Sequence, residues 1–341
     1  MDFGTFLPIL AIIPHSAAKG NRKPLAVFPP LGKVVRKMPF LSNRGRIFLA
    51  KKGRLCYTEN IMKRLSTDLH THTAFSPDGK GEMSEMLATA HALGVAYYGL
   101  SDHFNFDMIA NNIPLDGTKP QTPVAPYFQT ARRLQKEYEG RMCVLVGAEF
   151  GYADNPVAQK MCKELAETYR PDYIIQSVHN LAEGDYAFGY GYTDKNGKVR
   201  EKQETYEEYL GLVRRSLDVD HPYDILGHVG YCSRYAPYED RRMRWVDFAK
   251  SLDDILLTVI RKDKILEVNS SNKLGPSLTL PDNDILERYF ELGGRKISFG
   301  SDAHLPSRIL EHREKVMDTL RSIGYEYVTV PCRGEHFKIE I

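Results

Sequence analysis

Short apolar runs alternate with amphipathic segments from residue 66 to the end of the chain. Seven of the runs have the length and the β-branched or aromatic character of buried strands, at 66–70, 95–101, 143–149, 173–179, 223–228, 265–269 and 296–302. The segments between and after them repeat apolar positions at helical spacing and often stop at glycine, at 81–94, 127–140, 156–169, 204–219, 244–263, 281–294 and 308–324. This alternation predicts βα units with a parallel sheet.

Seven parallel strands with return helices favour a barrel over two packed domains. We therefore predict an α/β fold, a distorted (β/α)7 TIM-like barrel that spans residues 62–341. An open, doubly wound sheet is the alternative. Two last apolar runs, at 326–330 and 337–341, predict a small terminal hairpin.

Residues 1–61 differ from the rest in charge and pattern. They hold eleven of the 46 Lys and Arg residues but only two of the 44 Asp and Glu residues, Asp2 and Glu59. The apolar run near the start contains a proline and follows an acidic residue, so it is a poor export signal. We predict that 1–61 is a basic extension, either a flexible leader, a transit segment or non-native sequence, and that the functional domain begins near Met62.

The remaining residues are mildly acidic, with 35 basic against 42 acidic side chains. This balance argues against a nucleic-acid partner, which needs clustered positive charge. No stretch of 18 apolar residues exists, so no membrane partner is expected. The five cysteines form no CxxC pair, which fits a reducing compartment and predicts a cytoplasmic protein. The sequence carries no signal for an oligomeric state.

Metal-binding residue types stand at the ends of nearly all the predicted strands. The first strand runs into DLHTHTAFSPDG at 68–79, where His70 and His72 share one face because side chains at i and i+2 of a strand point the same way. The C-terminal strand ends of a barrel meet at one rim. Convergence at this rim is therefore predicted for His70, His72, Asp102, His103, Glu149, His179, His228, Asp302 and His304.

These ligands are imidazoles and carboxylates without a thiolate, which suits Zn, Mn or Fe. Glu149 is the candidate to bridge two cations, because a carboxylate offers two oxygens. Asp68 is a candidate partner of the ligands. A lone histidine is more often a packed or solvated side chain, and we expect that role for the others, His15, His91, His221, His312 and His336.

The segments DLHTHTAFSPDG, GLSDHF, GAEFG, SVH, GHVG and GSDAH together resemble the motifs of the PHP (polymerase and histidinol phosphatase) superfamily. Their order resembles the histidinol-phosphate phosphatase family, over about residues 66–325. The resemblance implies a (β/α)7 barrel with three metals at its rim. It implies one metal held by His70, His72, Glu149 and Asp302, a second held by Glu149, His179 and His228, and a third held by Asp78, His103 and His304.

The segment GHVGYCSRY resembles a family stretch that ends in Arg-Tyr, which implies that Arg234 contacts and binds the substrate phosphate. A solvated loop arginine is the alternative. Gly230 stands where relatives commonly have aspartate, so this chain departs from the pattern there. The segments EVNSSN and LPDNDILERYFELGG also resemble the histidinol-phosphatase branch.

The implied activity is hydrolysis of L-histidinol phosphate by a metal-activated hydroxide, with two or three divalent ions and with Asp302, His304 and Arg234 in catalytic roles. The partner is then a small phosphomonoester. Glu183 or Asp185 are candidates to face the amine of such a substrate. The alternatives are another small phosphate ester, a PHP nuclease module, and a metal-binding scaffold without activity.

Overall fold

The computed structural model describes residues 47–50, 54–57, 66–113, 121–272 and 277–341. Within the predicted N-terminal extension, the backbone of β1 (Ile47–Ala50) pairs antiparallel with that of β2 (Arg54–Tyr57). The sequence analysis expected no strands there. The rest of the extension and the boundary at Met62 lie outside the described residues, so the domain assignment stays a prediction.

All seven predicted parallel strands are present. They are β3 (Ser66–Asp68), β4 (Val95–Leu100), β6 (Cys143–Val146), β8 (Ile174–Ser177), β9 (Ile225–Leu226), β10 (Ile265–Asn269) and β11 (Ile297–Gly300). β10 has the predicted bounds, and the other six are shorter than predicted, because most of the metal-binding residue types follow the last ladder hydrogen bonds. The strand interiors are almost entirely buried, as expected of a sheet covered on both faces.

Two of the strands are interrupted before they reach the rim. β4 resumes as β5 (His103–Phe104), and β6 resumes after Gly147 as β7 (Ala148–Gly151). A side chain at Gly147 would lie 2.4 Å from the ring of Tyr173, so only glycine fits at this break. The ladder is consequently divided into two parallel sheets, ordered β3-β4-β6 and β11-β10-β9-β8-β7-β5.

Backbone hydrogen bonds join the first strand to the last and close the barrel. The amide of Leu69 donates to the carbonyl of Phe299 at 3.0 Å, and that of His72 donates to Ala303 at 2.9 Å. The buried carboxylate of Asp68 accepts from the amides of Ser301 at 2.9 Å and Leu310 at 3.0 Å. Asp68 therefore locks the seam between the strands. These bonds exclude the open sheet and confirm the predicted barrel.

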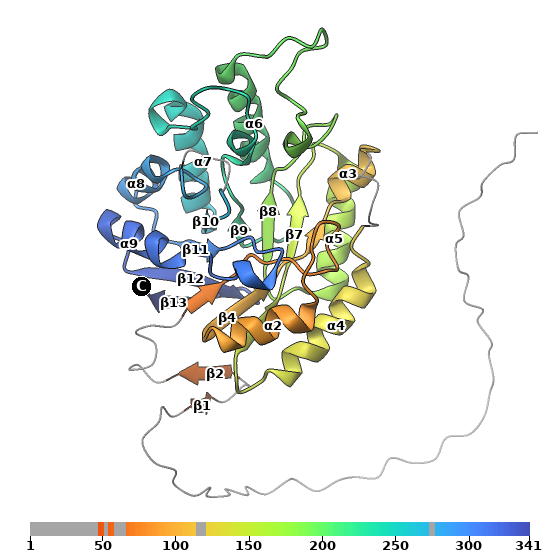
Figure 1. Cartoon of the computed structure of the whole chain (residues 1–341), viewed down its shortest axis with the longest axis vertical. Coiled ribbons are helices and arrows are strands. Elements are labelled where there is room, and N and C mark those ends of the chain that lie inside the picture. The colour runs from red at the N-terminus through yellow and green to blue at the C-terminus, as the bar shows by residue number, and fades with distance from the viewer. Residues whose placement is uncertain (1–46, 51–53, 58–65, 114–120, 273–276) are drawn as a thin grey trace, which may run out of the picture. The chain divides into compact units, whose positions relative to one another are not determined.

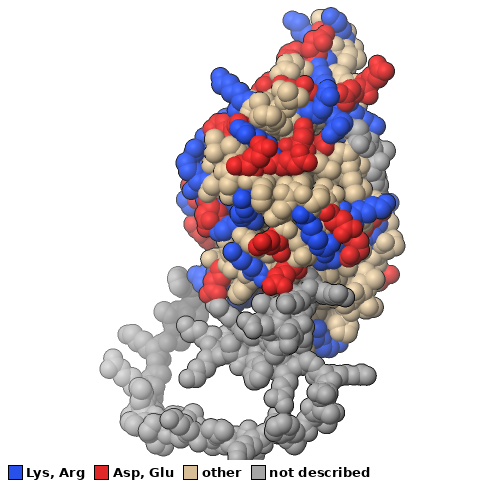
Figure 2. Space-filling view, turned by 90° about the vertical axis from the view of Figure 1, so that its left-hand side faces the viewer, with Lys and Arg blue, Asp and Glu red and all other residues tan. Residues whose placement is uncertain are grey.

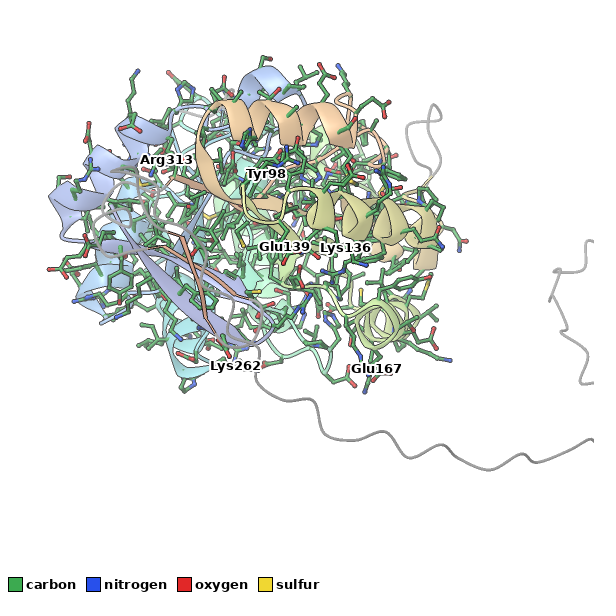
Figure 3. The ribbon with its side chains drawn as sticks, turned by 90° about the horizontal axis from the view of Figure 1, so that it is seen from below. Tyr98, Lys136, Glu139, Glu167, Lys262 and Arg313 are labelled. Carbon is green, nitrogen blue, oxygen red and sulfur yellow. The ribbon has the colours of Figure 1, made fainter. Side chains whose placement is uncertain are left out.

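Helices lie outside the strands, as Figure 1 shows for α2 (Met83–Ala92), α4 (Val124–Glu137), α5 (Pro156–Tyr169), α6 (Lys202–Ser216), α7 (Ala249–Arg261), α8 (Asn283–Glu291) and α9 (Arg313–Ile323). Each corresponds to a predicted helical segment, whereas the short α3 (Phe106–Ala110) was not predicted. In Figure 3 the side chains of Lys136 and Glu167 point away from the barrel that holds Tyr98. The apolar faces of the helices thus pack inward on the strands.

The chain ends in the predicted antiparallel hairpin, formed by β12 (Tyr327–Cys332) and β13 (Glu335–Glu340).

On the face seen in Figure 2, acidic and basic side chains are interspersed. That face carries no continuous positive patch among its described residues. Among the described helices, none has the length and apolar character needed to cross a bilayer.

Candidate metal centre

The C-terminal ends of the strands bring eight of the predicted metal ligands to one rim of the barrel, and Asp78 joins them from the loop after β3. His70 and His72 follow β3, His103 begins β5, and Glu149 lies in β7. His179, His228 and the pair Asp302 and His304 follow β8, β9 and β11. Four groups of three side chains each place their ligand atoms within 4.8 Å of one another. Residues separated by most of the chain length therefore become neighbours, as the barrel geometry requires.

Glu149 lies at the centre of these residues and is fully buried. Its Oε1 lies 2.9 Å from Nε2 of His228 and 3.3 Å from Nε2 of both His70 and His179. Its Oε2 lies 2.6 Å from Nδ1 of His103. The hydroxyl of Ser177 donates to Oε1 at 2.6 Å and fixes the carboxylate. Each oxygen faces a different set of imidazoles, which is the arrangement that a bridging carboxylate needs.

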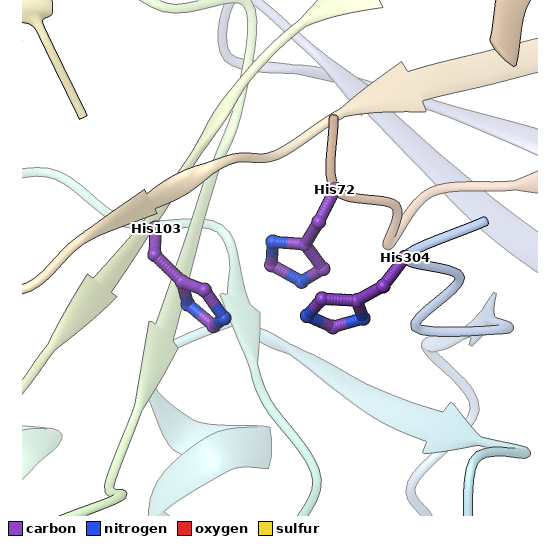
Figure 4. Close-up of side chains that lie close together, drawn as sticks. All are labelled: His72, His103 and His304. Carbon is purple, nitrogen blue, oxygen red and sulfur yellow. The ribbon is translucent and has the colours of Figure 1, made fainter. Parts of the chain in front are cut away.

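Three imidazoles stack on the other side of the centre, as Figure 4 shows. The ring of His72 lies between those of His103 and His304, with centroids 4.1 and 4.3 Å away. Asp78 completes the group, because its carboxylate oxygens lie 3.0 Å from Nε2 of His304 and 3.6 Å from Nε2 of His103. Asp78 is the one ligand candidate that is more than half exposed, so this position is open to solvent.

The observed groups follow the three implied ligand sets only in part. His72 and His70 lie 3.2 and 3.8 Å from Oδ1 of Asp302, and His179 lies beside His228, with their Nε2 atoms 3.2 Å apart. His72 also groups with His103 and His304, and His70 with Glu149 and His228. His103 lies between two sets as well, because one ring nitrogen faces Asp78 and the other faces Glu149. His103 can thus bind in the third set or join Glu149 and His179 in the second.

Several of the candidate ligand atoms lack a hydrogen-bond partner, which suits a site that binds a cation. The buried nitrogens His70 Nε2, His72 Nε2 and His304 Nε2 have no hydrogen-bond partner among the described residues, and neither does Oε2 of Glu149. Burial opposes ionisation of Glu149, yet the surrounding histidines hold its pKa well below the usual range. Burial, together with His103 and His304, depresses the pKa of His72. Ionised carboxylates and a neutral imidazole are the forms that bind a divalent metal.

A second layer of contacts orients the ligands, and it includes a residue that the sequence analysis missed. Glu267 on β10 lies with Oε1 2.6 Å from Nδ1 of His70, and its other oxygen accepts the amide of His228. Asp102, predicted as a metal ligand type, instead accepts the amides of Thr73 and Ser76 and so shapes the loop that carries Asp78. The sequence signal for Glu267 was an acidic residue in the middle of an apolar strand.

Arg234 lies in the short 3-10 helix η2 (Tyr231–Arg234), directly after β9. It is only 7% exposed, which rules out the solvated loop arginine. Its Nη1 lies 3.6 Å from Oδ2 of Asp302, while Nε and Nη2 have no hydrogen-bond partner among the described residues. A buried guanidinium with unused donors beside the carboxylates is placed to receive an anion.

A cavity of about 630 Å³ opens above the centre. Its lining includes His103, His179, His228, Asp302 and His304 together with Arg234. Asp185 also lines it, whereas Glu183 is exposed and does not. The other described histidines contribute nothing to the cavity. His221 packs its ring against Phe150, and His336 contacts Lys296.

Known proteins are similar to this chain in sequence and in fold. A Histidinol-phosphatase of Lactococcus lactis is 26% identical over 264 residues, 77% of this chain and 93% of the relative. A protein of Thermotoga maritima named "Probable histidinol-phosphatase" is 26% identical over 266 residues, 77% of this chain and 94% of the relative. The crystal structure of histidinol phosphate phosphatase from Lactococcus lactis, complexed with Zn, L-histidinol and phosphate, matches with a TM-score of 0.66. It is 22% identical and covers 80% of this chain and 99% of its own, so it supports the fold.

The family comparison covers the strands that carry most of the ligands. The model of the PHP domain matches residues 68–271, more than half of the chain. The matched segment runs from Asp68 at the barrel seam through Glu149 to the loop after β10. The part of the barrel from Asp68 to the loop after β10, with the predicted ligands from His70 to His228, thus matches a known domain. The chain belongs to the PHP domain family.

Proposed function

We propose that this chain is a metal-dependent phosphomonoesterase that hydrolyses L-histidinol phosphate to L-histidinol and phosphate, a step of histidine biosynthesis. The observation that carries the proposal is the convergence of seven imidazole and carboxylate side chains around Glu149, with Asp78 next to them and the buried Arg234 beside them. Two or three divalent ions, Zn, Mn or Fe, are the proposed cofactors. The names of the relatives support the choice of substrate.

The chemistry requires positive charge at the phosphate and a water that ionises near neutral pH. Bound divalent cations supply both, since they neutralise phosphoryl oxygens and lower the pKa of a water ligand. His70, His72, Glu149 and Asp302 would hold one cation, and Glu149, His179 and His228 a second. Asp78, His103 and His304 would hold a third, at the solvent-open side of the rim.

Arg234 would bind the phosphate at the same rim. A guanidinium presents parallel donors that match two phosphate oxygens, and burial strengthens the interaction. Asp302 Oδ1 faces His72 at 3.2 Å, while Oδ2 faces Arg234 at 3.6 Å. Asp302 thereby couples the ligand cluster to the arginine. Its backbone has a positive φ of 53°, a conformation rare outside glycine, asparagine and aspartate and frequent at functional sites.

The departing alkoxide needs a proton, and the geometry bears on its source. Nδ1 of His304 lies 2.9 Å from the backbone carbonyl of Asp302 and donates its proton there. Nε2 is then the electron-pair donor and faces Asp78. We therefore assign His304 to cation binding, and because Asp302 is proposed as an ionised cation ligand, a water is left to protonate the leaving oxygen. The His304→Gln variant should bind less metal at the third site after loading. The basic limb of its pH profile of kcat should not change.

The experiment is phosphate release by the metal-loaded chain from L-histidinol phosphate and from a panel of other metabolite monophosphates. We expect the highest kcat/KM for L-histidinol phosphate, loss of activity with a chelator, and recovery with Zn or Mn. Single-stranded DNA serves as the comparison substrate for the nuclease alternative. A higher kcat/KM for another ester would replace the substrate, and activity that survives full metal removal would refute the mechanism. Cytoplasmic location, proposed from the composition, is tested by fractionation of the native host.

A further inference from the structure

The cavity above the metal centre has walls of opposite character. The loops after β9 and β11, with the loop after β3, contribute Lys80, Arg234 and Arg308. The arc formed by the loops after β5 and β8 contributes Asn105, Met108, Asn180, Asp185 and Phe188, and its described lining residues include no lysine or arginine. Since β5, β7 and β8 are neighbours in the sheet, this arc is continuous. One wall suits a phosphate, and the other carries acceptors.

A tight turn after β8 aligns two of these acceptors. Asn180 and Asp185 form an antiparallel bridge, and the amide of Leu181 donates to the carbonyl of Gly184 at 3.0 Å. Oδ1 of Asp185 accepts from the amide of Ala187 at 2.7 Å and from the hydroxyl of Tyr231 at 3.2 Å. Oδ2 accepts no hydrogen bond from a described residue. The carboxylate is therefore held in place with one oxygen available to a ligand.

Asn180 is oriented by a second buried carboxylate. Its Nδ2 donates to Oδ2 of Asp107, and its Oδ1 has no partner among the described residues. Asn180 is 4% exposed and Asp107 is fully buried. Asp107 fits only because residue 151 is glycine, as a Cβ there would lie 2.5 Å from both carboxylate oxygens. With its nitrogen engaged, the amide offers its oxygen, and a buried acceptor without a donor calls for one from a ligand.

The acceptor pair lies next to the metal ligands. Asn180 directly follows His179, and the ring of Tyr231, which donates to Asp185, lies 5.0 Å from the ring of His179. If the phosphate of a substrate binds at the cations and Arg234, substituents a few bonds from that phosphate thus lie against the wall that carries Asn180 and Asp185. Oδ2 of Asp185 and Oδ1 of Asn180 are two neighbouring acceptors without a hydrogen-bond donor among the described residues, a pair that suits a cation with several N–H bonds.

We infer that Asp185 and Asn180 form a subsite for the protonated primary amine of an aminoalkyl phosphate, with Asp107 as a positioning residue that orients the Asn180 amide. The inference rests on the proposed function in that it places the amine of the same substrate. It makes Asp185 the residue that selects amine-bearing esters over otherwise identical phosphates.

The test compares L-histidinol phosphate with its deamino analogue, 3-(imidazol-4-yl)propyl phosphate, on the metal-loaded full chain. Asp185→Asn keeps an acceptor for Ala187 but removes the charge. We expect kcat/KM for the amine ester to fall about 30-fold, mainly through KM, as for loss of a charged hydrogen bond. For the deamino ester we expect a change of less than about threefold. The control, Glu183→Gln, alters an exposed carboxylate in the same turn and should leave both values unchanged.

Asp107→Asn frees the Asn180 amide to rotate, so the amine preference should shrink several-fold while deamino hydrolysis persists. Equal losses of kcat/KM for both esters in Asp185→Asn, or an unchanged preference, would overturn the subsite. If the wild-type chain fails to hydrolyse L-histidinol phosphate, the proposed function is refuted but the amine subsite is not. The subsite is then tested by comparing the hydrolysis of 2-aminoethyl phosphate with that of ethyl phosphate. A preference for the amine that Asp185→Asn removes then supports the subsite, and no preference refutes it.

Discussion

Nδ1 of His70 lies 2.6 Å from Oε1 of Glu267, with both side chains buried inside the barrel. This contact fixes the ring so that Nε2 points at Glu149 and Asp302. Partners of this kind orient metal-binding imidazoles and raise their basicity. Glu267 is therefore the clearest case of a residue that serves the centre without reaching its ligand atoms.

Replacement of Glu267 by glutamine should weaken metal binding about 10- to 100-fold, because the His70 ring loses its charged partner. Competition with a chromophoric chelator measures the affinity. Glu314→Gln, on the exposed face of α9, is the matched control and should bind metal normally. Wild-type affinity in Glu267→Gln would show that His70 needs no such support.

Metal removal should destabilise the barrel, since buried donor atoms then lack a partner. Saturating Zn or Mn should raise the melting temperature of chelator-treated protein by about 5–10 °C, as expected for ligand at 100 times its Kd. Glu149→Ala should abolish most of this rise and the turnover as well. Differential scanning fluorimetry gives the readout, with Glu164→Ala on α5 as the exposed control. An equal rise in Glu149→Ala would place the metal elsewhere.

Arg234 is expected to contribute phosphate affinity in a form that lysine cannot replace. Arg234→Lys should lower kcat/KM by about 100-fold and weaken inhibition by inorganic phosphate, because the parallel donors are lost. Metal content should stay at the wild-type level, which separates phosphate binding from ligand binding. Arg321→Lys, on the surface of α9, should behave as wild type. A loss of metal from Arg234→Lys would indicate a structural role at Asp302 instead.

A substitution at the end of β8 that lies away from the metal centre should lower stability without changing activity. The buried carboxylate of Asp172 accepts from Arg132 at 2.6 Å, from Arg333 at 2.7 Å and from the amide of Val146 at 2.9 Å. Asp172→Ala should cost about 2–3 kcal/mol of unfolding free energy and leave kcat unchanged, because Asp172 precedes β8 whereas His179 follows it. Chemical denaturation and a phosphate-release assay measure the two effects.

The same variant carries a pH prediction. Burial opposes ionisation of Asp172, but Arg132 and the Val146 amide hold its pKa below the usual value. Its stabilising contribution should be complete above about pH 4 and lost as the pH falls through the lower native pKa. The difference in stability between wild type and Asp172→Ala should therefore shrink below about pH 4. A constant difference across that range would mean that the contribution is not electrostatic.

Much of this architecture could be predicted from the sequence, because strands buried on both faces are short apolar runs, and residue types that bind metals stand at their ends. His70 with His72 and Asp302 with His304 could be paired from local spacing alone. The proximity of Glu149 to five histidines required the closed barrel, which no local pattern encodes.

Other features depend on tertiary packing. Asp102 resembles a ligand from its position after a strand, yet it binds backbone amides because the loop at 73–76 folds over it. Glu267 stands out in the sequence only as an acidic residue within an apolar strand, and its contact with His70 depends on the closed barrel. Glu183 and Asp185 are only two residues apart in the turn after β8, yet Asp185 lines the cavity and Glu183 is exposed.

The hydrogen bond from Ser301 to Asp68 joins positions 233 residues apart in the chain. The ligand groups that contain Asp302 or His304 are consequently incomplete until the last strand has docked against the first. The full set of ligands therefore exists only in a chain that has closed into a ring.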